Sequence, residues 1–205
     1  MGYSDQTISR VASFFHALIT SNIALYILLT RDSSVLHNPG NFVDPLWSIM
    51  FALTSIYLSV DLILMLVMPS KNDMLWIFHH IVGGLGIFWM WQINRAWLLG
   101  LLFELTEMST IFLNCTWYYI HFKKKPDIFF YLASLGLLST FFVTRWAGGV
   151  YMWYYVLRNT TFWLQNMNLF ENLYIFVGTA VITFLNVKWG LQLVAKLLEQ
   201  VKKRP

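Results

Sequence analysis

Charged residues are scarce in this chain, because Asp, Glu, Lys and Arg together make up only 12% of its 205 residues. Soluble domains carry about 25% charged residues, which cover the surface that faces water. Hydrophobic residues make up 58% of the chain and aromatic residues 18%, so a bilayer has to solvate most of its surface. The single cysteine, Cys115, excludes an internal disulfide framework. The composition therefore predicts an integral membrane protein.

Long apolar runs divide the chain into six segments of membrane-spanning length. A helix needs about 20 mostly apolar residues to cross the hydrocarbon core. Runs of this kind cover residues 8–30, 46–68, 74–93, 96–120, 128–157 and 168–195. The sequence thus predicts an all-α, polytopic fold of about six helices, with one transmembrane domain over 1–205 that ends in a short basic tail, 196–205. The fifth run is longer than a bilayer requires, so we expect a bend or an end near Gly148-Gly149.

Lysine and arginine are distributed unevenly between the two ends of the predicted bundle. Six spans place both termini on one side, whose basic residues are Arg10, Lys71, Lys123, Lys124, Lys125, Lys196, Lys202, Lys203 and Arg204. The opposite side carries Arg31, Arg95 and Arg158. Cytoplasmic or matrix loops hold the excess of basic residues, so we expect both termini on that positive side. This asymmetry accounts for the net charge of +4 without nucleic acid as a partner.

Several ionisable residues lie inside the predicted spans, where a charged group costs about 2.5–3.5 kcal/mol on insertion scales. They are Asp61, His79, His80, Glu104, Glu107 and Arg145. The spacing of Glu104, Glu107 and Asn114 places these three on one stripe of a helix. We expect that stripe to face the interior of the bundle.

These polar residues have a structural and a functional interpretation. Asp61, Glu107 and Arg145 have the charges for mutual neutralisation in a buried network that holds helices together. His79 and His80 differ by about 100° around a helix, so both can border one interior pocket. The remaining histidines stand alone in the sequence: His16, His37 and His121. Membrane di-iron enzymes need several histidine boxes, so no metal site is predicted.

Five short motifs occur in an order that resembles a known membrane family. They are a Tyr-x-x-x-Asp at 57–61, the histidine pair at 79–80, FELTEMSTIFLN over 103–114, a Phe-Phe-x-x-Arg at 141–145 and a Leu-Asn-x-x-Trp at 185–189. Together they span about 45–190 and resemble the TLC domain of ceramide synthases, translocon-associated TRAM proteins and the neuronal-ceroid-lipofuscinosis-type ER protein. The resemblance implies a TLC-like bundle around a polar-lined, lipid-accessible cavity. We expect its lining to include Asp61, Glu104, Glu107, Asn114 and Arg145.

The resemblance also implies a candidate activity. In ceramide synthases, paired histidines and a downstream pair of aspartates are tied to acyl transfer onto a sphingoid amine. His79 and His80 match the histidine pair, and Glu107 is the candidate that orients one of them, with acyl-CoA as substrate and no cofactor. The segment that should carry the aspartates reads Glu-Met-Ser-Thr-Ile from Glu107 to Ile111.

Three functions follow as hypotheses. The first is a non-catalytic TLC-like protein that binds membrane lipids or acts as a scaffold, with other membrane protein subunits as partners, for example in a mitochondrial respiratory or ATP synthase complex. The second is an acyl-CoA-dependent lipid acyltransferase. The third is an ER lipid-homeostasis or cargo-adaptor protein, which the dilysine-like sequence at 202–205 favours. The expected location is the mitochondrial inner membrane or the endoplasmic reticulum.

Overall fold

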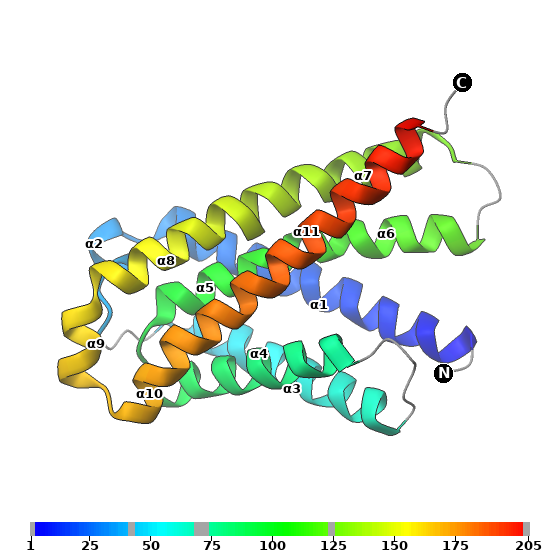
Figure 1. The fold of residues 1–205 in the computed structure, drawn as a ribbon. Helices are drawn as coiled ribbons and strands as arrows, with labels where there is room; N and C mark the ends of the chain where they lie inside the picture. The colour runs from blue at the N-terminus through cyan, green and yellow to red at the C-terminus, as the bar shows by residue number, and fades with distance from the viewer. Residues whose placement is uncertain (1–2, 41–43, 68–73, 123–125, 203–205) are drawn as a thin grey trace.

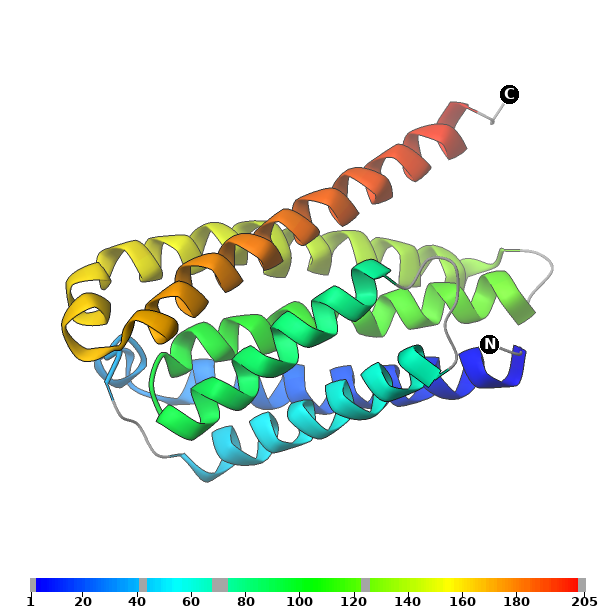
Figure 2. The same ribbon diagram turned by 60° about the horizontal axis from the view of Figure 1, so that its bottom comes forward.

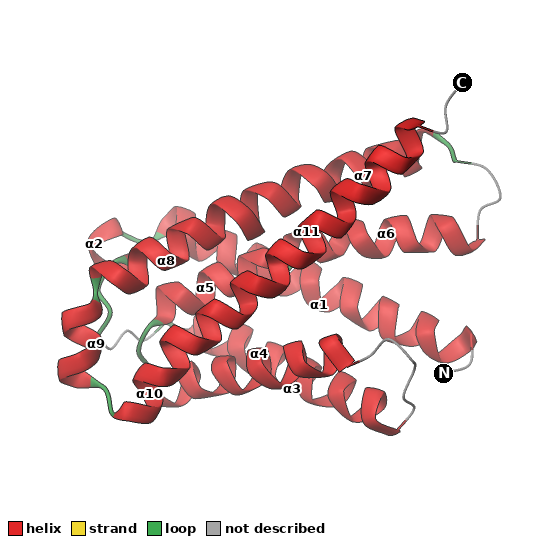
Figure 3. Ribbon diagram, in the orientation of Figure 1, coloured by secondary structure: helices red, strands yellow, loops and turns green. Residues whose placement is uncertain are grey.

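The computed structural model describes residues 3–40, 44–67, 74–122 and 126–202, with side chains described from residue 7 to residue 196 within those ranges. All regular elements in these ranges are helices (Figure 3). They are α1 (Tyr3–Thr30), α2 (Ser33–Leu36), α3 (Pro45–Val67), α4 (Met74–Ile93), α5 (Trp97–Thr106), α6 (Met108–Phe122), α7 (Ile128–Thr140), η1 (Phe141–Ala147), α8 (Gly148–Arg158), α9 (Thr160–Asn166), α10 (Leu169–Leu173), η2 (Tyr174–Gly178) and α11 (Thr179–Lys202). Lys71, the lysines at 123–125 and residues 203–205 of the tail lie outside the described residues.

Six helical segments of the described chain are long and apolar enough to cross a membrane. They cover Thr7–Thr30, Pro45–Val67, Met74–Ile93, Trp97–Phe122, Ile128–Arg158 and Leu169–Lys196. These bounds confirm the six predicted runs to within two residues. Large apolar side chains such as Ile63, Leu66, Phe129 and Val150 are exposed on the outside of the bundle. A bilayer solvates such a surface, so the protein is an integral membrane protein.

The six spans form a ring rather than a sequential row. α1 packs against α3 and α3 against α4, while α4 reaches across to α11 and η2. α11 packs against η1 of the fifth span, and the fifth span packs against α5 and α6, which return to α1. Figures 1 and 2 show the start of α1 and the end of α11 at the same end of the bundle. One face of every span is therefore available to line a common axis.

The fourth span is interrupted between the end of α5 and the start of α6. No proline or glycine at this point of the sequence predicts the interruption. The backbone N–H of Glu107 bonds to the carbonyl of Glu104 at 3.0 Å, a tighter turn than an α-helix makes. The Thr106 hydroxyl donates to the carbonyl of Phe103 at 2.7 Å, and the Ser109 hydroxyl donates to that of Thr106 at 3.0 Å. Such hydroxyls compete for helical carbonyls, which accounts for the local tightening at Glu107.

The fifth and sixth spans each contain a π-helical turn, η1 and η2. A π turn widens the helix and is frequent at functional positions. Here the two turns carry Arg145 and Tyr174, which both line interior cavities. Of the expected bend or end near Gly148-Gly149, the end is wrong, because α8 begins at Gly148 and continues the same rod to Arg158 (Figure 1). The irregularity of the fifth span is the π turn η1, which ends at Ala147, directly before Gly148.

The end of the bundle opposite the termini is closed by short segments and an ion pair. The Arg31 guanidinium donates to the buried Asp44 carboxylate at 2.7 Å, which ties the exit of α1 to the entry of α3. This hydrogen bond and the charge of Asp44 raise the pKa of Arg31. Between α4 and α5 the chain turns through Asn94 and Ala96, both with positive φ. Such conformations are uncommon outside glycine and allow a tight reversal.

Candidate functional site

A cavity of about 240 Å³ lies inside the ring toward the end that holds the termini. All six spans contribute to its wall. The lining residues are Arg10, Ser13, Tyr57, Leu58, Trp76, His79, His80, Glu107, Ser109, Thr110, Leu113, Leu137, Phe141, Arg145, Trp189, Gln192, Leu193 and Lys196. We call this the outer cavity. Its combination of charged, hydroxyl and aromatic groups matches the polar-lined cavity predicted from the sequence.

Arg145 is the most connected polar residue of the outer cavity. Its guanidinium donates to the Ser109 hydroxyl at 2.8 Å, to the side-chain oxygen of Asn186 at 2.9 Å and to the Thr110 hydroxyl at 3.3 Å. The Glu107 carboxylate lies 3.7 Å away. Arg145 is only 7% exposed. The predicted pairing of Glu107 with Arg145 is therefore present and joins the fourth and fifth spans. The hydrogen bond to Asn186 connects Arg145 to the sixth span as well.

Asp61 pairs with a histidine and not with Arg145. Its Oδ2 atom lies 3.5 Å from Nδ1 of His80, and its Oδ1 atom accepts a hydrogen bond from the Ser9 hydroxyl at 2.8 Å. The expected mutual neutralisation of Asp61, Glu107 and Arg145 is thus replaced by two separate pairs. A carboxylate beside one ring nitrogen fixes the orientation of an imidazole.

Asn114 faces the first span. Its amide donates to the Ser13 hydroxyl at 3.1 Å, and its oxygen accepts from the Arg10 guanidinium at 3.4 Å. The Arg10 guanidinium also lies over the Trp117 ring, 5.6 Å from the ring centre. Asn114 therefore positions Arg10 at the cavity wall and is not itself part of the lining.

His79 and His80 both line the outer cavity, as the sequence predicted. The His79 ring packs edge-on against Trp189 at 5.3 Å, and Trp189 stacks on Trp76 at 4.6 Å. No described hydrogen bond reaches Nδ1 of His79. Glu107, the candidate partner from sequence, lies 3.7 Å from Arg145 and lines the same two cavities as His79.

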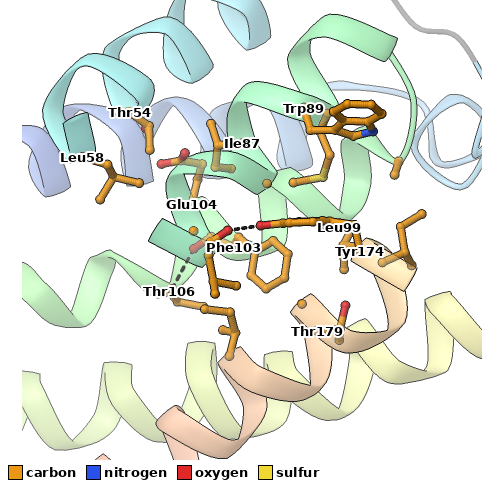
Figure 4. A pocket seen from close by; sticks show the side chains of 18 of the residues that line it. Thr54, Leu58, Ile87, Trp89, Leu99, Phe103, Glu104, Thr106, Tyr174 and Thr179 are labelled. Atoms are coloured by element: carbon orange, nitrogen blue, oxygen red, sulfur yellow. Dashed lines mark hydrogen bonds between the residues drawn. The ribbon is translucent and has the colours of Figure 1, made fainter. Parts of the chain in front are cut away.

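A smaller cavity of about 70 Å³ continues the interior toward the opposite end, and we call it the inner chamber. Figure 4 shows its wall, in which Glu104 and Thr54 lie together across from Tyr174 and Thr179. Apart from Glu104, Glu107, Glu171, His16, His79 and a few hydroxyls, the lining is apolar. The Tyr174 hydroxyl donates to the carbonyl of Val82, so this side chain crosses from the sixth span to the third.

Leu58, His79 and Glu107 line both the outer cavity and the inner chamber. We call these three residues the neck. They place an imidazole and a carboxylate between a polar compartment and a mainly apolar one. The interior therefore has the polarity gradient of an amphiphile, with a charged end near the termini and an apolar end near mid-bundle.

The predicted site residues fall into separate groups. His79, His80, Glu107 and Arg145 line the outer cavity, and Glu104 lines only the inner chamber. Asp61 and Asn114 line neither cavity. Asp61 contacts the lining residue His80, and Asn114 contacts the lining residue Arg10. Among the described residues, no three His, Cys, Asp or Glu side chains converge as a metal-binding group.

Several lining residues were missed from the sequence. Arg10 and Lys196 lie near the ends of spans and were counted only as topology signals. His16 looked isolated, yet it stacks on Tyr57 at 4.1 Å and its Nε2 atom contacts the Thr54 hydroxyl at 3.0 Å. The helical spacing of Arg10, Ser13 and His16 on one side of α1 is the signal that could have identified this wall.

The ring of spans, the paired histidines and the buried arginine occur together in a chain whose sequence matches one family profile. The profile is that of the TLC domain, and it matches residues 6–195. This chain belongs to the TLC-domain family. The match begins before the first span, so α1, which supplies Arg10 and His16, is part of the TLC domain. A comparison with curated proteins gives no match.

Proposed function

We propose that this TLC-domain protein is a non-catalytic lipid-binding protein that holds an amphiphile in the outer cavity and the inner chamber. The observation that carries the proposal is that the two compartments share Leu58, His79 and Glu107 in their walls. The outer cavity offers charged and hydroxyl groups, whereas the inner chamber offers mostly hydrocarbon. Binding sites for small ligands are mainly apolar, with a few convergent polar groups.

The polar residues of the interior support a binding role over a catalytic one. Glu107 is engaged with Arg145, and no described hydrogen bond reaches Nδ1 of His79. The segment from Glu107 to Ile111 also lacks the aspartates of the ceramide synthases. In this proposal the membrane partners are lipids and other protein subunits, the protein being an accessory part of a larger assembly. Its termini face the positive side of an organelle membrane.

The test is purification of the tagged full chain in mild detergent, with mass spectrometry of the proteins and lipids that accompany it. A stoichiometric set of membrane subunits and a defined, intact lipid would support the proposal and would identify the organelle. Replacing His79 and His80 together with Ala should leave cellular lipid classes unchanged, provided that the variant elutes as a single folded species. Loss of one lipid class with that variant would refute the non-catalytic role.

A second function, acyl transfer from a coenzyme A thioester, is favoured by one observation. The Asp61 carboxylate lies 3.5 Å from Nδ1 of His80, an arrangement that orients a general base. In this reaction a hydroxyl or amine of a lipid attacks the thioester carbonyl. A C–O or C–N bond forms, the C–S bond breaks, and the proton passes through His80 to the coenzyme A thiolate.

The discriminating experiment is incubation of the purified protein with a labelled acyl-CoA and an extract of its own membrane lipids. An acylated lipid that appears with the wild type and is lost in both His80→Ala and Asp61→Asn would establish the enzyme. His37→Ala is the matched control, because His37 contacts Tyr151 and lines neither compartment. Absence of product with all variants would favour the binding role.

A further inference from the structure

Among the described residues, the lining of the outer cavity carries more positive than negative charge. Three cations line it, namely Arg10, Arg145 and Lys196, against a single carboxylate, Glu107. Asp61 does not line the cavity, but its carboxylate attracts the Arg10 guanidinium electrostatically. The cavity therefore has a surplus of one to two positive charges, depending on whether Asp61 is counted. With Asp61 counted, the remaining positive charge corresponds to Lys196, which is exposed. A positive surplus at this end of the cavity attracts an anion.

Arg145 retains donors for such an anion. A guanidinium has five N–H groups, and the described hydrogen bonds of Arg145 to Ser109, Asn186 and Thr110 use three of them. Of the other two, one is on the terminal nitrogen that lies 3.7 Å from the Glu107 carboxylate, and the one on the second terminal nitrogen is not used by these partners. Because Arg145 is held by partners on two other spans, the fourth and the sixth, it is fixed in place before a ligand arrives, which lowers the entropic cost of binding.

The two other cations lie nearer the end of the bundle that holds the termini. Arg10, on the first span, donates a hydrogen bond to the Asn114 side chain of the fourth span. Lys196 is exposed near the end of the sixth span. Gln192, one helical turn before Lys196, lines the same wall. These residues come from α1 and α11, which both reach the end of the bundle where the termini lie and diverge there (Figures 1 and 2). An anion that approaches from the headgroup region at that end meets them first.

We propose that the outer cavity binds the phosphate headgroup of an anionic phospholipid, with a phosphomonoester preferred to a phosphodiester. This inference rests on the proposed lipid-binding function and specifies its ligand. A phosphomonoester carries about −1.5 to −2 charges at pH 7 and three strong acceptor oxygens, which matches the surplus charge. A carboxylate has only two oxygens and one charge.

The rest of the cavity fits the remainder of such a lipid. In this proposal part of one acyl chain passes the neck at Leu58 and enters the inner chamber, which has a volume of about 70 Å³ and a mainly apolar wall. The outward surface of the bundle is apolar, so the second chain lies in the bilayer. A single ligand therefore explains the charged outer cavity, the neck and the apolar inner chamber.

The experiment uses the purified full chain in nanodiscs made from an equimolar mixture of phosphatidate, phosphatidylglycerol and phosphatidylcholine. The lipids retained after transfer to detergent are quantified by mass spectrometry. We expect phosphatidate to be retained most and phosphatidylcholine least. Lys196→Gln and Arg10→Gln should each lower the preference for phosphatidate by about fivefold, the worth of one partly exposed ion pair.

Lys188→Gln is the matched control, because Lys188 lies on the same helix as Lys196 and lines neither compartment. Its preference for phosphatidate should equal that of the wild type. Equal retention of the three lipids, or an equal loss with Lys188→Gln, would overturn the headgroup assignment while lipid binding itself stood. Retention of no lipid at all would refute the proposed function as well.

Two further arms identify the source of the phosphate. Inorganic phosphate and coenzyme A are added to the retained complex in separate titrations. If the lipid is the ligand, neither compound displaces phosphatidate at equimolar concentration, because neither has a chain for the inner chamber. Displacement of phosphatidate by coenzyme A would instead assign the three cations to a soluble phosphate compound and overturn the proposal.

Discussion

The guanidinium of Arg145 donates a hydrogen bond of 2.9 Å to the side-chain oxygen of Asn186, which joins the fifth and sixth spans inside the membrane. Arg145 lies in the π turn η1, and Asn186 is almost fully buried in α11. The same guanidinium bonds to Ser109 and lies beside Glu107, so one side chain connects three spans. The outer cavity therefore depends on Arg145 for its shape as well as for its charge.

Replacing Arg145 with Gln should lower the free energy of unfolding by about 3–5 kcal/mol, because the Glu107 carboxylate is left buried without its cation. Thermal unfolding in detergent measures this loss. The double variant Arg145→Gln/Glu107→Gln should recover most of the stability, since no charge is then unpaired. Arg158→Gln is the control, because Arg158 contacts only the exposed Tyr154 among its described partners. If the double variant were as unstable as the single one, the ion pair would not be the cause.

The fold was predictable because its determinant is a one-dimensional pattern. Six apolar runs give six spans, and the bilayer requires each of them to be helical. The family motifs also identified the residues that line the interior, including His79, His80 and Arg145. The ring order was not predictable, because nothing in the length or composition of a run says which other spans it contacts.

The pairing inside the cavity was only partly predictable. Charge alone allowed Asp61 or Glu107 to pair with Arg145, and the structure selects Glu107 because Asp61 is on the far side of the ring, beside His80. The turn at Glu107 arises from hydroxyl hydrogen bonds of Thr106 and Ser109. Those depend on rotamers, which a sequence pattern does not specify.

Gly100→Ala should destabilise the protein, since a Cβ atom there would overlap the Phe51 ring. Both residues are buried, so the ring has to shift, and overpacking of this kind costs about 1–3 kcal/mol. Gly149→Ala is the matched comparison, because nothing lies within 4 Å of its added Cβ. It should be neutral or stabilising by up to about 1 kcal/mol, the difference in helix propensity. Thermal unfolding of both variants in detergent tests the contrast, and equal midpoints would contradict it.

Asp32 should make the stability of the short helix α2 depend on pH. Its carboxylate accepts hydrogen bonds from the backbone and hydroxyl of Ser34, and these hold the pKa of Asp32 below its usual value. A lowered folded-state pKa stabilises the helix above the unfolded pKa of about 3.9, and the contribution is lost as the pH falls through the folded value.

The measurement is hydrogen exchange of residues 33–36, divided by the exchange rate of an unfolded peptide at the same pH. Protection should be constant near neutral pH and should decline below about pH 4. Asp32→Asn keeps a neutral capping oxygen and should show no such decline. The same decline in this variant would assign the effect to another group.

Tyr174 should control how quickly a ligand exchanges between the inner chamber and the bilayer. Its hydroxyl bonds to the carbonyl of Val82, and within the described residues this is the hydrogen bond that joins α4 to the sixth span. Tyr174→Phe should lower stability by only about 1 kcal/mol, the worth of one neutral hydrogen bond. The contact between α4 and η2 beside the inner chamber, which we call the seam, should nevertheless open more often. A retained lipid should therefore exchange faster with added vesicles.

Gly86→Ala provides an independent route to the same opening, because its Cβ atom would lie 2.7 Å from the Tyr174 hydroxyl and displace that side chain. Both variants should therefore accelerate lipid exchange. Tyr154→Phe, which removes an exposed hydroxyl bonded to Arg158, should leave the exchange rate unchanged. Faster exchange in Tyr154→Phe, or an unchanged rate in both chamber variants, would mean that lipid leaves through the mouth of the outer cavity and not across the seam at Tyr174.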